Sequence, residues 1–138
     1  RFASEIAQKQ IDNFDHRQKH LKTITSLVDE AMNVVQSDGR PIREIGELLH
    51  QSWQLKRELA DSVTTLEIDE IYDAALDAGA LGGKLLGAGG GGFVLLFVEP
   101  DKQAAVKERL KDLVRVDFGI DDVGSKIVLY EPDGLENR

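Results

Sequence analysis

The sequence has no cysteine among its 138 residues, and several other features are scarce or missing. The lack of cysteine excludes disulfide bonds, thiolate metal ligands and a cysteine nucleophile within this chain. Proline occurs three times, and aromatic residues make up 6% of the sequence. The longest purely apolar run, residues 93–98 (FVLLFV), is far shorter than the roughly 20 residues of a membrane-spanning helix. We therefore expect neither a membrane span nor a signal peptide.

Positive charge is in deficit, because 25 acidic residues face 17 basic ones and the net charge is −8. This balance argues against nucleic acid or an anionic membrane as the main partner. The hydrophobic fraction of 41% is ordinary for a globular domain. Because the chain opens on Arg1 and passes directly into a helix-forming segment, we interpret residues 1–138 as one domain of a longer, cytoplasmic protein.

Apolar spacing predicts three helices within the first 80 residues. The first ends at residues 37–41 (SDGRP), and its inward stripe is Leu21, Ile24, Val28, Ala31 and Val35. Pro41 suits the first turn of the second helix. The inward residues of that helix are Ile42, Ile45, Leu48, Leu49, Trp53 and Leu59. A third helix is predicted over residues 66–78, ended by Gly79, with Ile68, Ile71, Tyr72 and Ala75 inward.

The pattern changes to strands in the second half of the chain. Strands are predicted at residues 84–86, 93–98, 114–118 and 126–130, with an amphipathic helix over residues 100–114. Helices followed by this mixed unit predict an α+β fold, with long N-terminal helices packed on a small, mainly antiparallel sheet.

Glycine is concentrated in one place: seven of the 13 glycines lie within "GGKLLGAGGGG", residues 82–92. Gly87, Gly89 and Gly92 match the spacing of a dinucleotide-binding loop, but the residues that follow are typical of a strand and not of a helix. A P-loop is excluded too, because no Lys-Ser or Lys-Thr pair follows the last glycine.

Two interpretations of this loop remain open. Between residues 78 and 98 there is no carboxylate, and Lys84 is the only charged residue. Exposed backbone N–H groups, no side chains and one nearby cation suit a loop that approaches phosphate. The alternative is a structural turn, with Lys84 reaching solvent at the end of a strand.

A second set of candidate residues lies on the second helix. His50, Trp53 and Arg57 fall on one helix face with Lys56 beside them, an arrangement that could hold a sugar phosphate. The alternative is a tryptophan packed in the core with cations at a solvated rim. His16 and His20 are one turn apart, but no third ligand stands at a suitable spacing, so we predict no metal site.

The segment "GGKLLGAGGGGF" resembles the glycine-rich third motif of the GHMP kinases, which include galactokinase, homoserine kinase and mevalonate kinase. Four further segments resemble the C-terminal half of the bacterial D-glycero-D-manno-heptose 7-phosphate kinases: "SEIAQKQ", "IGELLHQSWQLKREL", "IDEIYDAALDAGALGGKLLGAGGGGFVLLFVEP" and "GSKIVLY". Together these segments span nearly the whole chain. The resemblance implies the C-terminal domain of a GHMP kinase, with ferredoxin-like elements in its sheet.

The resemblance also implies a function. It implies transfer of the ATP γ-phosphoryl group, with magnesium, to the anomeric hydroxyl of a heptose 7-phosphate. The loop lining the cleft beside the ATP phosphates would consist of Gly87, Ala88, Gly89, Gly90, Gly91 and Gly92. Lys84, His50, Trp53, Lys56 and Arg57 would contact substrate or phosphate. The catalytic and magnesium-binding residues of the family lie in an N-terminal kinase domain, so none is assigned here.

Two further hypotheses stay open from the sequence. One is a stand-alone α+β ligand-binding or regulatory module without catalysis. The other is a helical interaction domain in which residues 1–60 form a homodimer and the glycines only make a turn. An upstream domain with its own phosphate loop would favour the kinase.

Overall fold

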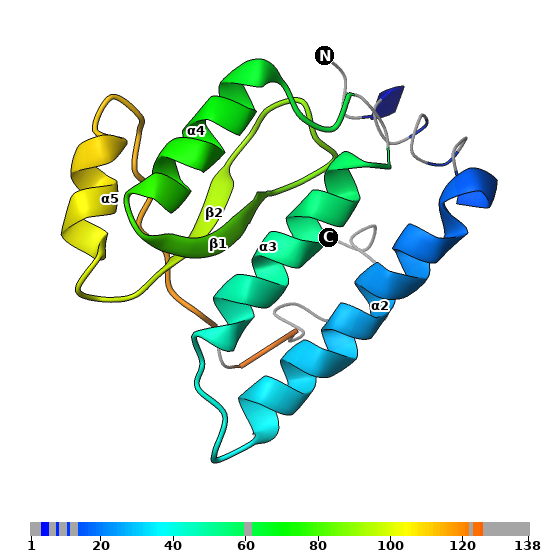
Figure 1. Cartoon of the computed structure of the whole chain (residues 1–138), viewed down its shortest axis with the longest axis horizontal. Helices are drawn as coiled ribbons and strands as arrows, with labels where there is room; N and C mark the ends of the chain where they lie inside the picture. Colours follow the sequence, from blue (N-terminus) through cyan, green and yellow to red (C-terminus); the bar gives the residue numbers. More distant parts are fainter. Residues whose placement is uncertain are drawn as a thin grey trace, which may run out of the picture.

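The computed structural model of the chain describes residues 4, 5, 8, 11, 14–59, 62–121 and 123–125. In chain order the elements of this part are α2 (Phe14–Gln36), α3 (Glu44–Arg57), α4 (Leu66–Asp77), β1 (Ala80–Leu85), β2 (Val94–Val98) and α5 (Gln103–Arg109). The two strands form an antiparallel hairpin surrounded by the helices (Figure 1). This arrangement confirms the predicted α+β class and the small antiparallel sheet.

The hairpin lies between α3 on one side and α4 with α5 on the other (Figure 1). Gly82 pairs with Phe97 across the sheet, and both lie against Gly46 of α3. Leu96, which alternates with Phe97, packs with Ala75 of α4 and Val106 of α5. Ala80 joins this cluster, because the register of β1 shifts between Ala80 and Gly82. Successive side chains of a strand point to opposite faces, so α3 covers the face of Gly82, and α4 and α5 cover the other face, where Trp53 of α3 also reaches Leu85. Helix α2 packs on α3.

The third helix is confirmed, and the reasons are local. Thr65 caps α4, because its hydroxyl accepts the N–H of Ile68 at 3.3 Å, and acidic residues occupy the first turn. Its inward residues Ile68, Tyr72 and Ala75 are buried as predicted. The largest fully buried side chains of the described residues are Trp53, Tyr72, Leu85 and Val63. The core therefore forms where α3, α4 and β1 meet.

The inward stripe predicted for the first helix is wrong at two of its five positions. Val28 and Val35 are 59% and 64% exposed, whereas Val34 is only 2% exposed. Apolar residues cover a wide arc of α2, and contact with α3 alone buries one edge of that arc. Similarly, Ile42 precedes α3 and is exposed, while Leu59 follows the helix and is buried.

Two element boundaries differ from the sequence prediction. Strand β1 begins at Ala80, four residues earlier than predicted, because Gly82 and Gly83 weaken the strand signal although both are paired with β2. Helix α5 spans only Gln103–Arg109, and tight turns follow it, such as the bond from the Leu113 N–H to the Leu110 carbonyl at 3.0 Å. The predicted helix over residues 100–114 was too long at both ends.

The strand predicted at residues 114–118 is also wrong. This segment is irregular, with Val114 91% and Phe118 74% exposed. Its alternating pattern suits a strand, but a ladder also needs a neighbour, and none of the described residues pairs with it. The strand predicted at residues 126–130 lies outside the described residues.

Candidate functional site

The glycine loop is the connection of the β1–β2 hairpin. The Leu86 N–H donates to the Phe93 carbonyl at 2.8 Å, so the ladder continues to the base of residues 87–92. Every glycine of this loop has a positive φ, from +73° at Gly90 to +156° at Gly91. Side chains with a Cβ rarely adopt such backbone angles, which explains the dense run of glycine.

One edge of the loop is docked and the other is open. The Gly90 N–H donates to the Val63 carbonyl at 2.9 Å, and a Cβ on Gly89 would stand 2.7 Å from the Val63 backbone. By contrast, a Cβ on Gly87 or Gly91 would meet no atom within 4 Å. The loop is therefore fixed on its inner edge and presents bare backbone on its outer edge.

Helix α3 brings Lys56 to the first residue of the loop. It runs beside β1 in the same direction, since Gly46 lies against Gly82 and Lys56 reaches Gly87. The Lys56 ammonium donates to the Gly87 carbonyl at 2.5 Å. Lys84 shares a strand face with Gly82, which is the face covered by α3.

The two lysines are close enough to affect each other. Burial lowers the pKa of Lys56 below its ordinary value of 10.5, and the positive charge of Lys84 lowers it further. Neither lysine forms an ion pair with a carboxylate of the described residues. The root of the loop is consequently a small region of positive charge in an acidic chain.

The other residues predicted on α3 make separate contacts. Trp53 is fully buried in the core, as the packing alternative predicted. His50 is half-buried, and its Nδ1 lies 2.8 Å from the Tyr72 hydroxyl, with the two rings stacked at 5.9 Å. Arg57 donates to Asp69 at 2.7 Å, and also to the Gln54 side chain. Of the predicted contact residues, the structure brings only Lys56 and Lys84 together beside the loop.

Some residues that shape the site were not singled out from the sequence. Val63 holds the loop from a segment more than 20 residues away, and Gly46 allows α3 to approach β1. Burial raises the pKa of Tyr72, while a hydrogen bond from the Gly83 backbone lowers it in part. A glycine inside an otherwise regular helix is the one signal that could have indicated the close approach at Gly46.

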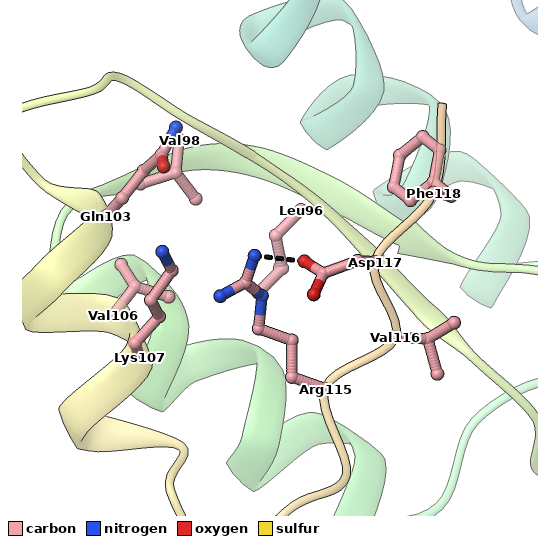
Figure 2. Close-up of a pocket in the computed structure, with 9 residues that line it drawn as sticks. All are labelled: Leu96, Val98, Gln103, Val106, Lys107, Arg115, Val116, Asp117 and Phe118. Atoms are coloured by element: carbon pink, nitrogen blue, oxygen red, sulfur yellow. Dashed lines mark hydrogen bonds and ion pairs between the residues drawn. The ribbon is translucent and has the colours of Figure 1, made fainter. Parts of the chain in front are cut away.

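A pocket of about 280 Å³ lies away from the loop, between β2, α5 and residues 115–118 (Figure 2). Leu96, Val98 and Val106 give it an apolar wall, and the side chains of Arg115 and Asp117 pair across its opening. Leu96 is on the strand face opposite Lys84's side of the hairpin. The pocket includes none of the residues predicted to bind ligand.

The part of the chain that the structure describes contains neither a cluster of metal ligands nor a helix able to span a membrane. No group of three or more His, Asp or Glu side chains there is arranged to hold a metal ion. None of the helices described is long and apolar enough to cross a membrane. His20, one of the two histidines considered for metal binding, contacts Glu58 at 2.6 Å.

Comparisons with known proteins agree with the architecture. The chain is 32% identical over 111 residues to the D-glycero-alpha-D-manno-heptose 7-phosphate kinase of Campylobacter jejuni, covering 74% of this chain and 32% of that enzyme. It is 36% identical over 94 residues to the mevalonate kinase of Pyrococcus abyssi, covering 66% of this chain and 27% of the relative. The chain thus spans about a third or less of the length of these relatives.

A solved structure shares the fold. The mevalonate kinase of L. major, crystallised with R-mevalonate, matches with a TM-score of 0.66 at 24% identity, over 81% of this chain and 35% of that one. A family model described as "GHMP kinases C terminal" matches residues 18–115, which include the whole glycine loop and both lysines. The chain belongs to the GHMP kinase family, and the part of the family that it matches is the C-terminal one.

Proposed function

We propose that this chain is the C-terminal part of an ATP-dependent small-molecule kinase, in which residues 87–92 line the cleft beside the ATP phosphates. The observation that carries the proposal is the one-sided docking of the loop. Val63 holds its inner edge, while Gly87 and Gly91 leave the outer edge free of side chains. Phosphate oxygens can approach a bare backbone closely, and backbone N–H groups are suitable donors to them.

The chemistry assigned to this chain is positioning and charge neutralisation. Phosphoryl transfer depends largely on these two effects, because negative charge is spread over the phosphate oxygens in the transition state. The loop would shape one wall of the cleft, and Lys56 and Lys84 would add positive potential at its root. The magnesium ligands and the base that activates the acceptor hydroxyl are assigned to an N-terminal domain of the same protein.

For the acceptor we propose a heptose 7-phosphate, phosphorylated at its anomeric hydroxyl. The Campylobacter jejuni relative supports this choice, and so do two half-buried cations in a chain of net charge −8. The competing acceptor is mevalonate, favoured by the Pyrococcus abyssi relative. His50, Trp53 and Arg57 already contact neighbouring side chains, which makes Lys56 and Lys84 the better candidates for a substrate phosphate. A cytoplasmic location and a homodimer stay predictions.

The test is a coupled assay of ATP consumption by the full-length kinase. The kcat/KM for heptose 7-phosphate should be higher than that for mevalonate or for the unphosphorylated heptose. Losing one charge-assisted phosphate contact costs about 10- to 150-fold, so the preference over the unphosphorylated sugar should reach at least that range. Equal turnover of the phosphorylated and unphosphorylated heptose would refute heptose 7-phosphate as the acceptor. If none of the three acceptors were turned over, the proposal that the protein is a kinase would be refuted.

The role of the loop is tested in the same assay with Gly90→Val. A branched side chain at a φ of +73° should displace the backbone and lower kcat by about a hundredfold. Gly39→Ala is the matched control, because a Cβ there meets nothing within 4 Å and Gly39 has no positive φ. Near-normal activity of Gly90→Val would mean that the loop is only a structural turn.

A further inference from the structure

Lys56 and Lys84 form a cationic pair that has no carboxylate partner among the described residues. The neighbouring cation Arg57, by contrast, is paired with Asp69. Acidic residues outnumber basic ones by 25 to 17, so carboxylates are not in short supply. A like-charged pair held close together is unfavourable by itself, and it attracts an anion.

The fold holds this pair in place from two directions. Lys84 is anchored by the ladder, where it pairs with Leu95 of β2. Lys56 is on the last turn of α3, which is tied to α4 by the bond between Arg57 and Asp69. Both lysines are half-buried. The two cations are therefore held by different elements, Lys84 by β1 and Lys56 by α3.

The contact between Lys56 and Gly87 connects the pair to the loop. A lysine ammonium has three N–H donors and no acceptor, and Lys56 gives one donor to the Gly87 carbonyl. Gly87 is otherwise unsupported on its outer side, since no atom lies within 4 Å of a Cβ built there. Lys56 is thus the described side chain that fastens the first residue of the loop to α3.

We propose that Lys56 and Lys84 bind one phosphate group between them, and that phosphate binding draws Lys56 away from the Gly87 carbonyl. A phosphate dianion is a stronger acceptor than a neutral carbonyl, and it also relieves the repulsion between the two ammonium groups. The first residue of the loop is then released from α3 while Gly89 and Gly90 stay docked on Val63. This inference rests on the proposed function, because the phosphate would belong to the acceptor or to ATP.

The binding step is tested with inorganic phosphate and the 15N-labelled 138-residue chain at constant ionic strength, followed by the amide signals of Lys84 and Gly87. We expect saturable shifts. Lys56→Gln and Lys84→Gln should each weaken binding by about tenfold or more. Lys22→Gln removes an exposed lysine of α2 and is the matched control, with unchanged affinity. If Lys84→Gln bound phosphate with wild-type affinity, or if chloride shifted the two amide signals as much as phosphate does, the proposed phosphate site would be refuted.

The link to the loop has its own readout. Without phosphate, Lys56→Gln should move the Gly87 amide signal, and Lys84→Gln should leave it near its wild-type position. Added phosphate should then move the wild-type Gly87 signal toward its position in Lys56→Gln. A shift in another direction would overturn the release of the loop. Lys56→Arg and Lys84→Arg keep the charge and should retain binding, which separates a lost contact from a lost fold.

The source of the phosphate is distinguished in the full-length kinase. If the site takes the acceptor phosphate, Lys84→Gln raises KM for the acceptor alone; if it takes an ATP phosphate, KM for ATP rises alone. If the full-length protein is an active kinase but its C-terminal chain binds no phosphate, the phosphate site is refuted and the proposed function stands. If the chain binds phosphate but the full-length protein has no kinase activity, the proposed function is refuted and the phosphate site stands.

Discussion

Among single residues, Tyr72 of α4 contacts both α3 and β1. Its hydroxyl lies 2.8 Å from Nδ1 of His50 on α3, and it receives the Gly83 backbone hydrogen bond from β1. Its ring packs beside the fully buried Trp53 at a centroid distance of 6.2 Å. Tyr72 therefore carries the polar contacts at the centre of an otherwise apolar core.

Replacing this hydroxyl should have an effect that depends on pH. Tyr72→Phe should lower the free energy of unfolding at pH 7 by about 1–3 kcal/mol, because His50 and Gly83 lose a partner. Burial raises the pKa of Tyr72 above 10.0, so the unfolded chain ionises first as the pH rises. The native state of the wild type thus loses stability above about pH 10, and that loss should be smaller in Tyr72→Phe.

Urea unfolding of both proteins between pH 7 and 11 measures this difference. Lys56 contributes with the opposite sign, because its pKa is lowered in the native state and deprotonation there favours folding. Both proteins contain Lys56, so its contribution cancels in the comparison. Parallel loss of stability in the two proteins at high pH would show that Tyr72 does not titrate with unfolding.

The candidate site could be predicted in part. The charge-free segment around Lys84 and the glycine run were both visible in the sequence, and so was Lys56. The partners that define the geometry were not, because Val63 and Tyr72 reach the loop and β1 only through tertiary packing. Periodicity shows which residues share a face, but it does not show that Trp53 turns to the core while Lys56 turns to the loop.

At the scale of elements, α3 and β1 approach each other through two glycines. A Cβ on Gly46 would stand 2.7 Å from the Leu81 Cβ and 3.0 Å from the Phe97 ring. A Cβ on Gly82 would stand 2.0 Å from the Gly46 carbonyl oxygen. The helix and the strand are in contact almost backbone to backbone, which is what brings Lys56 within reach of the loop.

Gly46→Ala should therefore destabilise the fold, although alanine is the better helix former by about 1 kcal/mol. The added methyl group cannot fit without moving α3 away from the hairpin, and overpacking of this kind costs about 1–3 kcal/mol. Thermal and urea unfolding provide the measurement. Gln51→Ala, at an exposed position of the same helix, is the control and should be neutral or slightly stabilising. A more stable Gly46→Ala would show that the contact at Gly46 is loose.

The elements themselves were predicted unevenly, for reasons of packing. Helix α4 was predicted well because its apolar stripe and its terminal glycine agree, and Thr65 caps it in the structure. The face of α2 was wrong because its apolar arc is wider than the surface that α3 covers, so periodicity alone did not choose between Val34 and Val35. The prediction of a strand at residues 114–118 was wrong. Alternation of apolar and polar residues shows which side chains would share a face, but it does not show whether another strand is present to pair with the segment.

For the whole molecule, we expect that the 138-residue chain alone folds but does not transfer phosphate. It spans about a third or less of the length of the kinases that it resembles. A coupled assay with ATP, magnesium and heptose 7-phosphate should show no turnover by the purified chain. Turnover that survives further purification, and disappears in Gly90→Val, would contradict the division of the active site between two domains.

The irregular segment after α5 bears on how this molecule behaves in solution. Val114, Val116, Phe118 and Ile120 are all exposed, and they alternate with Arg115 and Asp117, whose charges cancel. A short, β-prone stretch with little net charge is the type of sequence that pairs with copies of itself. The net charge of −8 keeps such copies apart at low ionic strength. Added salt screens that repulsion within about 10 Å at 0.1 M, so self-association of the chain should increase with salt concentration.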